Sequence, residues 1–241
     1  DGGLYHFPFI NILNENKLIV GLSNLHFRYG HISIIQYFSS IYNNILFTDN
    51  GILVPSSIIF FSLLGYLLCE IFRKDSDIIY KFLSLMFSLY ILLNMNRYSS
   101  WGNDDFASII FFIIIIESYK YFQNKSQNSF TKIILLCTIC FLIKTFYLII
   151  FLLPLSLLLI SFKKIKLKEY FSINLFFCFV FIVLWLIRGY LTTSCLIFPV
   201  NFTCFENFDW SLNEEYITRV SHISEAWSKD WPNYDLKNQY N

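Results

Sequence analysis

The most constraining feature of the chain is the separation of its charged residues from long apolar stretches. Only 15% of the 241 residues are charged and 56% are hydrophobic, with a mean hydropathy of +0.52, whereas soluble domains carry about 25% charged residues. This pattern predicts an all-α, polytopic transmembrane helix bundle. The uncharged stretches, rich in Ile, Leu and Phe, are residues 50–69, 82–96, 145–162 and 170–187.

Composition excludes several other classes of protein. The chain has 18 basic and 17 acidic residues and a net charge of +1, so it lacks the basic surface that nucleic acid requires. Its aromatic and β-branched content excludes a disordered chain, and six cysteines are too few for a disulfide scaffold. Because the chain begins at Asp1 without a signal-peptide pattern, we expect a further segment before it.

Six membrane spans are predicted from helix length. A helix needs about 20 apolar residues to cross about 30 Å of hydrocarbon. The stretch 133–162 is too long for one span and short for two, so we expect a hairpin of short helices with Lys144 near its turn. Glu117 and Lys120 are expected at a span end, where a long side chain reaches the headgroups. The six spans are residues 52–70, 78–96, 106–122, 133–144, 145–162 and 170–188.

The positive-inside rule orients these spans. Loops 73–81, 120–132 and 163–168 together carry ten of the eighteen basic residues, so all three are expected to be cytoplasmic. The opposite face then receives most of the acidic residues. We therefore predict three regions: a non-cytoplasmic loop with interfacial helices at 1–50, the bundle at 51–189, and a non-cytoplasmic tail at 190–241, with the short loop 97–105 also on the outer side.

The amino end carries a candidate catalytic group. Asp1 is followed by two glycines and, five positions later, by His6. The carboxylate of Asp1 suits a general base acting on a hydroxyl, or a ligand for a cation. The alternative is an Asp that caps an interfacial turn, and spacing alone favours that alternative.

A second cluster in the segment from Gly21 to His31 contains one guanidinium and two imidazoles, those of Arg28, His26 and His31. Arginine offers a fixed fork of donors that matches phosphate, and histidine donates to phosphate oxygens or moves a proton near neutral pH. The cluster therefore suits a lipid-linked phosphate. An arginine reaching the headgroups and histidines that cap helices explain the same residues equally well. A metal site from Asp1, His6, His26 and His31 has no diagnostic ligand spacing.

Three charged residues near the outer ends of spans complete the candidate site. Asp104 and Asp105 precede the span that starts at Phe106. They suit a helix cap, a substrate contact or a cation ligand. Lys144 is expected in the outer half of the membrane, where a lysine needs a partner. We expect that partner to be one of these acids or an anionic ligand.

Two cysteine pairs have different interpretations. Cys195 and Cys204 lie on the expected non-cytoplasmic side, where an oxidising compartment favours a disulfide between them. Cys137 and Cys140 have CxxC spacing but lie in an apolar helix, and we interpret them as core residues. In the tail, aromatic residues such as Trp210 either stack on sugar rings or rest at the membrane interface.

The run Asp1-Gly2-Gly3-Leu4-Tyr5-His6, followed by Asn24-Leu25-His26-Phe27-Arg28, resembles a family of bacterial multi-pass membrane proteins that look like glycosyltransferases of the GT-C superfamily. The resemblance extends to Asp104 and Asp105, to Lys144 and to the segment from Cys195 to Trp210. It covers most of the chain. The first transmembrane helix and the tight acidic pair of better-known GT-C branches have no counterpart here, which leaves metal dependence open.

The resemblance implies a GT-C-like fold and a polyprenyl-phosphate sugar as donor substrate. Asp1 matches the catalytic acid of the first outer loop, and His26, Arg28 and Lys144 would neutralise the departing lipid phosphate. His6 would contact the substrate, while Asp104 or Asp105 would orient the acceptor or, with Asp1, bind a divalent cation. The acceptor would be a cell-envelope glycan or lipid, and the site would face the periplasm or exterior from the bacterial cytoplasmic (inner) membrane.

Two other functions share these features. A non-catalytic translocation or assembly subunit for a surface polysaccharide would need a polar path through the spans, and apart from Lys144 the spans contain almost none. A polysaccharide polymerase or ligase would use the same lipid-linked substrate. Sequence does not separate it from a glycosyltransferase.

Overall fold

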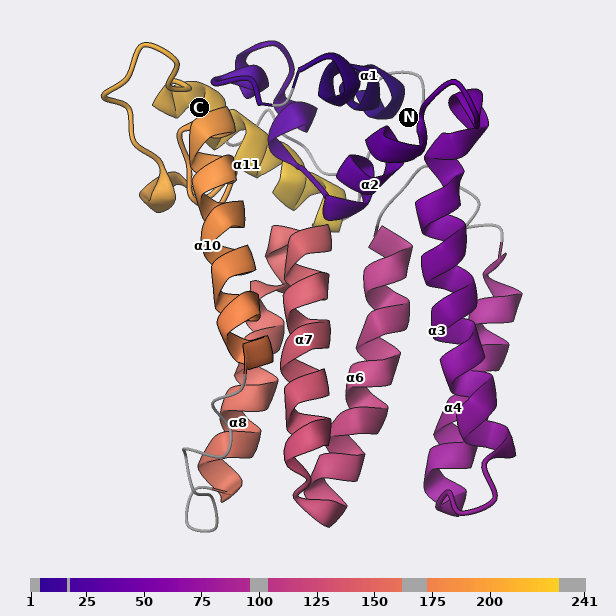
Figure 1. Ribbon diagram of the computed structural model, residues 1–241. Helices are drawn as coiled ribbons and strands as arrows, with labels where there is room; N and C mark the ends of the chain where they lie inside the picture. Colours follow the sequence, from indigo (N-terminus) through magenta and orange to yellow (C-terminus); the bar gives the residue numbers. More distant parts are fainter. Residues whose placement is uncertain (1–4, 17, 96–103, 162–172, 230–241) are drawn as a thin grey trace. The chain divides into compact units, whose positions relative to one another are not determined.

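The computed structural model describes residues 5–16, 18–95, 104–161 and 173–229 (Figure 1). Every regular element in these ranges is a helix, apart from an isolated bridge between Cys195 and Cys204, which confirms the all-α prediction. The chain divides into two compact units. The first unit comprises Asp1–Glu15 and Ser33–Val183, and the second unit comprises Asn16–Ile32 and Leu184–Asn241.

The first unit is a bundle of long apolar helices that run side by side (Figure 1). Its core lies around α6, whose middle part is apolar on every side and which packs most extensively against α7. Fully buried core residues include Phe106, Ile114 and Phe130. The elements of this unit are α1 (Phe7–Glu15), α2 (Ile34–Tyr42), η4 (Thr48–Leu53), α3 (Val54–Phe72), α4 (Ile78–Leu93), α6 (Asp104–Asn124), α7 (Gln127–Ile143), η5 (Thr145–Phe151) and α8 (Leu152–Ser161).

Local sequence signals account for several helix boundaries. Pro55 lies in the first turn of α3, where its missing N–H costs nothing. Asp77 caps α4 by accepting a hydrogen bond from the amide of Ile79. At Lys144 the backbone is extended, which ends α7 before η5 and α8 begin. Both η5 and α8 pack against α7. The chain therefore breaks at the position where the sequence predicts the turn of a hairpin.

Among the described residues, three helices are long and apolar enough to cross a membrane: Thr48–Phe72, Phe106–Asn124 and Ile173–Thr193. They overlap the predicted spans 52–70, 106–122 and 170–188. The other three predicted spans fall on shorter apolar helices, Ile78–Leu93, Gln127–Ile143 and Thr145–Ile160. Because these helices contain between 10 and 17 residues, the six-span path stays a prediction.

An ion cluster joins α3 to α6 in the first unit. Lys120 Nζ lies 2.9 Å from Glu70 Oε1 and 3.1 Å from Glu117 Oε1, and the Tyr66 hydroxyl donates to the same Glu117 oxygen. The side chains of Glu117 and Lys120 are only 1% and 14% exposed. This differs from the expectation that both reach the headgroups. The physical reason is that Glu70 and Tyr66 of α3 supply polar partners inside the bundle.

The second unit is built around the carboxyl-terminal part of α10. Its core contains buried side chains from the segment after α10 and from α11, among them Phe198, Leu212 and Val220. The first part of α10 belongs to the other unit. The elements are η2 (Leu22–Asn24), η3 (Phe27–Gly30), α10 (Ile173–Thr193), η7 (Asn201–Thr203) and α11 (Glu214–Lys229).

Candidate functional site

A short turn at residues 26–31 of the second unit holds His26 and Arg28, which the sequence predicts to bind phosphate. It is called the basic turn below. His26 precedes η3 and caps it, because its Nδ1 accepts a hydrogen bond from the backbone N–H of Arg28 at 3.2 Å. A neutral imidazole that accepts at Nδ1 carries its hydrogen on Nε2. The cap therefore fixes the ring so that Nε2 is the nitrogen able to donate to a ligand. His26 and Arg28 are both half-buried.

Aromatic rings support the two basic side chains. The imidazole of His26 stacks on the ring of Phe27 with centroids 4.9 Å apart, and lies 5.6 Å from the ring of Tyr29. The guanidinium carbon of Arg28 lies 5.2 Å from the Phe27 centroid, within reach of a cation–π interaction. One phenylalanine therefore contacts both basic groups. This packing limits the rotamers of His26 and Arg28.

The segment that leads into this turn is fastened to the end of α10. The amide of Gly21 donates to Leu191 O at 2.9 Å, and the hydroxyl of Ser23 donates to Thr192 O at 2.7 Å. These bonds satisfy carbonyl groups that the last turn of a helix leaves without partners. Gly21 has a positive φ of 68°, which favours glycine. The basic turn thus lies on the carboxyl end of a helix that is apolar and long enough to cross a membrane.

Gly30 allows the carboxyl end of the turn to approach a neighbouring ring. A Cβ at this position would lie 2.6 Å from Cδ1 of Phe198 and 3.0 Å from Cγ2 of Thr193. The ring of His31 meets the same Phe198 edge to face, with centroids 5.1 Å apart. The carboxyl end of the turn is therefore packed on Phe198 of the segment after α10.

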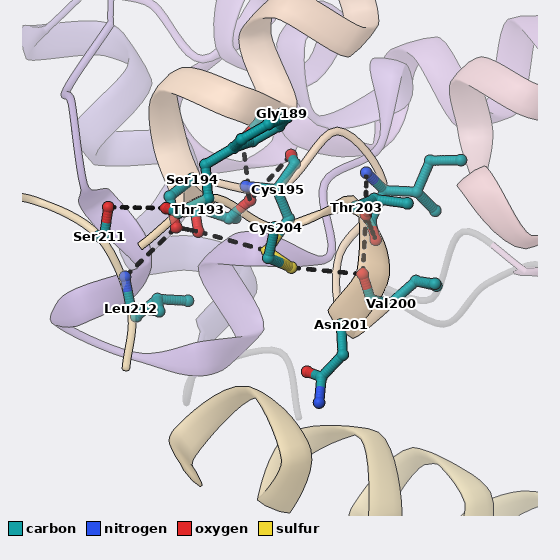
Figure 2. The surroundings of a disulfide bond; sticks show 12 residues. Gly189, Thr193, Ser194, Cys195, Val200, Asn201, Thr203, Cys204, Ser211 and Leu212 are labelled. Atoms are coloured by element: carbon teal, nitrogen blue, oxygen red, sulfur yellow. Dashed lines mark hydrogen bonds between the residues drawn. A yellow bond between two sulfur atoms is a disulfide. The ribbon is translucent and has the colours of Figure 1, made fainter. Parts of the chain in front are cut away.

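A disulfide between Cys195 and Cys204 closes that segment into a loop (Figure 2). The disulfide joins the two cysteines that are predicted from the sequence to form one. Hydroxyl groups fix the loop around it: Thr203 Oγ1 donates to Val200 O at 2.8 Å, and Ser194 Oγ accepts from the amide of Leu212 at 3.3 Å. These hydrogen bonds tie side-chain hydroxyl groups to the backbone and so give the loop a defined shape.

α11 supports the turn through Tyr216. Tyr216 packs with Phe27 on the core of the second unit, and its hydroxyl is hydrogen-bonded to the backbone of Phe27. Burial raises the pKa of the Tyr216 phenol above its ordinary value. Tyr216 is therefore neutral near pH 7 and supports the turn as a hydrogen-bonding group.

The remaining predicted site residues do not belong to the basic turn. His6 is buried in the first unit, where its Nδ1 lies 3.1 Å from Nε2 of Gln36. Lys144 is exposed at the carboxyl end of α7. Asp104 and Asp105 begin α6, but their side chains, like the whole of Asp1, lie outside the described part of the structure. The roles of these residues in binding and catalysis stay predictions.

Among the described residues, no group of three or more His, Cys, Asp and Glu side chains is arranged to hold a metal ion. His26 and His31 therefore do not form such a group in the second unit. The sequence predicts Asp1 and Asp104 as cation ligands. Asp1 and the side chain of Asp104 lie outside the described part of the structure.

Two kinds of residue were missed by the sequence interpretation. Ser23 and Thr192 fasten the turn to α10, and no local pattern in the sequence links residues so far apart. Arg188, by contrast, could have been identified from the sequence. It is the last residue of the span predicted at 170–188, where an arginine reaches the headgroups, and its guanidinium carbon lies 5.5 Å from the ring centroid of Trp185.

The comparisons with known proteins place the chain in a family. No curated protein and no solved structure matches it. A family model does match, and it covers residues 1–240, almost the whole chain. The chain therefore belongs to the family described as domain of unknown function DUF8201.

Proposed function

We propose that the chain is an integral membrane glycosyltransferase that moves a sugar from a polyprenyl-phosphate donor to a cell-envelope glycan or lipid acceptor on the outer face of a bacterial inner membrane. The observation that carries the proposal is the basic turn of the second unit. Its His26 and Arg28 are held on the end of α10, a helix long enough to cross a membrane.

The chemistry of this turn fits a phosphate that is attached to a lipid. The end of a membrane-crossing helix lies at the depth where lipid headgroups meet water. Arg28 offers the planar set of donors that binds phosphate oxygens in pairs, and His26 offers an Nε2–H donor. A soluble phosphate compound would not require this site to lie at a helix end within the membrane interface.

The proposed reaction is a displacement at the anomeric carbon of the donor sugar. An acceptor hydroxyl forms a bond to that carbon while the bond from carbon to phosphate oxygen breaks, and the phosphate leaves with the electron pair. The carboxylate of Asp1 takes the proton of the hydroxyl. Arg28 and His26, with Lys144, offset the charge that develops on the phosphate.

Transfer of labelled sugar tests the proposal. Membranes carrying the full-length protein are incubated with polyprenyl-phosphate sugars, and incorporation of label is compared among wild type, Asp1→Asn, Arg28→Ala and Arg219→Ala at equal membrane levels. Arg219 is a matched control, because it is an exposed arginine of α11 in the same unit. We expect transfer to be lost in the first two variants and kept in Arg219→Ala.

The other outcomes discriminate among functions. Transfer that persists in Asp1→Asn and Arg28→Ala would contradict the site assignment. Absence of transfer with every donor would contradict the glycosyltransferase and favour an assembly or translocation subunit. Formation of long glycans from a lipid-linked repeat unit would identify a polymerase.

A further inference from the structure

The turn between α2 and η4 presents two aliphatic side chains to the surroundings. Ile45 is 99% exposed and Leu46 is 86% exposed. Both residues belong to the first unit. Single exposed apolar residues are common on proteins, but a contiguous apolar patch commonly marks a surface that contacts a membrane or another protein.

Hydrogen bonds hold this turn in one shape. The side-chain oxygen of Asn44 accepts from the amides of Leu46 and Phe47 at 2.9 and 3.3 Å. The amide of Thr48 donates to Asn44 O at 2.8 Å, and the ring of Phe47 meets the ring of Tyr42 edge to face. Phe47 thereby packs on Tyr42, although its side chain stays 45% exposed. Ile45 and Leu46 are left at the tip of an ordered turn.

The turn is also fastened at both of its ends. On one side, the backbone carbonyl of Asn43 accepts a hydrogen bond from the side chain of Asn14 in α1 at 3.1 Å. The side-chain amide of Asn43 donates to Asn11 Oδ1, also at 3.1 Å. On the other side, the hydroxyl of Ser39 donates to Ile52 O at 2.8 Å. These contacts fix the apolar tip relative to α1, α2 and η4.

α2 extends the apolar surface beyond the turn. Phe38 and Ile41 are exposed, and residues three apart lie on the same face of a helix. The opposite face of α2 is occupied by buried residues, including Ile35 and Ser39. Phe38, Ile41, Ile45 and Leu46 are hereafter called the apolar tip surface.

Two observations favour lipid as the occupant of this surface. The turn leads directly into the helical segment Thr48–Phe72, which is apolar and long enough to cross a membrane, and whose exposed residues include Ile58 and Phe61. In addition, residues 32–48 contain no charged side chain but do contain Tyr37 and Tyr42. Tyrosine is enriched at the boundary between headgroups and acyl chains.

We infer that the apolar tip surface inserts into the outer leaflet of the bilayer beside the membrane entry of α3. The insertion holds α2 along the membrane surface. Ile45 and Leu46 enter the region of the acyl chains, and the asparagine side chains at the base of the turn face the headgroups. This inference does not depend on the proposed transferase activity.

Photo-crosslinking in vesicles tests the inference. The photoreactive residue p-benzoylphenylalanine is placed at position 45, or separately at 46, in the full-length protein reconstituted into phosphatidylethanolamine and phosphatidylglycerol vesicles. Asp75 is the control position, because it is exposed in the short loop that follows α3. After irradiation, mass spectrometry identifies what each position has captured. Both tip positions carry exposed bulky side chains, so these substitutions preserve the fold.

Acyl-chain adducts at positions 45 and 46, with none at position 75, are the expected result. Adducts between position 45 and a second copy of the chain or another polypeptide would overturn the inference and identify a protein contact. Recovery of the probe without lipid adducts at both tip positions would also overturn it, because it would show that the tip faces water.

Discussion

Gly30 determines how closely the basic turn approaches the segment after α10. We expect Gly30→Ala to lower the free energy of unfolding by about 1–3 kcal/mol, because the new methyl group would overlap the ring of Phe198 and force it to move. Thermal unfolding of the purified protein in detergent measures the change. Gly65→Ala is the control, because a Cβ at that position in α3 meets no atom within 4 Å. Equal stability of Gly30→Ala and wild type would contradict the packing described here.

The carboxylate of Asp77 makes the stability of α4 sensitive to acid. The amide of Ile79 and the side chain of Gln123 donate to it and lower its pKa. A lowered pKa in the folded state gives stability that is present above the unfolded pKa, about 3.9 for Asp, and is lost as the pH falls through the folded value. We expect wild type to lose stability relative to Asp77→Asn below about pH 4. Parallel pH profiles of the two proteins would contradict this assignment.

At the scale of whole helices, one lysine joins α3 to α6. Removing the charge of Lys120 would leave the buried carboxylates of Glu70 and Glu117 without their shared partner. We expect Lys120→Met to cost about 3–5 kcal/mol of stability, and neutralising both acids as Gln in the same chain to restore most of that loss. Denaturant unfolding in mixed micelles measures both changes.

Arg73 provides the matched control for this cluster. It also lies near Glu70, at 3.4 Å, but its side chain is 64% exposed. Because solvent screens an exposed ion pair, Arg73→Ala should cost less than about 1 kcal/mol. Similar losses in Arg73→Ala and Lys120→Met would show that burial does not distinguish the two contacts.

The cystine loop after α10 is stabilised by its closure. Replacing Cys195 and Cys204 with serine opens a short loop, and the entropy gained by the unfolded chain predicts a loss of about 2–3 kcal/mol. We expect Cys69→Ser, which removes an exposed free thiol, to leave stability unchanged. Unfolding curves recorded under non-reducing conditions measure the stability of both variants. A double-serine variant as stable as wild type would contradict the prediction.

For the molecule as a whole, the basic loops predict how the chain is oriented in the membrane. In a Cys69→Ser background, we expect a cysteine at Glu214 to react with a membrane-impermeant maleimide on intact cells. A cysteine at Asp75 should react only after the membrane is opened. The remaining free cysteines among the described residues are buried. The reverse labelling pattern would contradict the positive-inside assignment.

Sequence was most informative where one physical effect dominated. The uncharged stretches predicted helices because a chain in hydrocarbon has to satisfy its backbone hydrogen bonds internally, and the break at Lys144 appeared where a long apolar run exceeded one span. The uncharged stretches could not predict that the side chain of Glu117 points into the bundle. Its inward position depends on Tyr66 and Glu70 of another helix, and helical periodicity carries no information about such partners.

The candidate site was predictable only in part. The cluster of His26, Arg28 and His31 is visible in the sequence because its members are close neighbours. Its support by Ser23 and Thr192 is not visible, since these residues are 169 positions apart. The role of His26 as a helix cap was one of two interpretations left open by the sequence. The hydrogen bond from the amide of Arg28 establishes that role, which is compatible with donation from Nε2.

The long separation between Ser23 and Thr192 also has a consequence for biosynthesis. A ribosome adds about 5–20 residues per second, so the turn is made roughly ten to thirty seconds before the helix end that receives it. During that interval the early segment has no docking partner. A nascent or truncated chain that stops before α10 therefore cannot dock the basic turn, and the second unit is completed only after α10 and the segment that follows it have been synthesised.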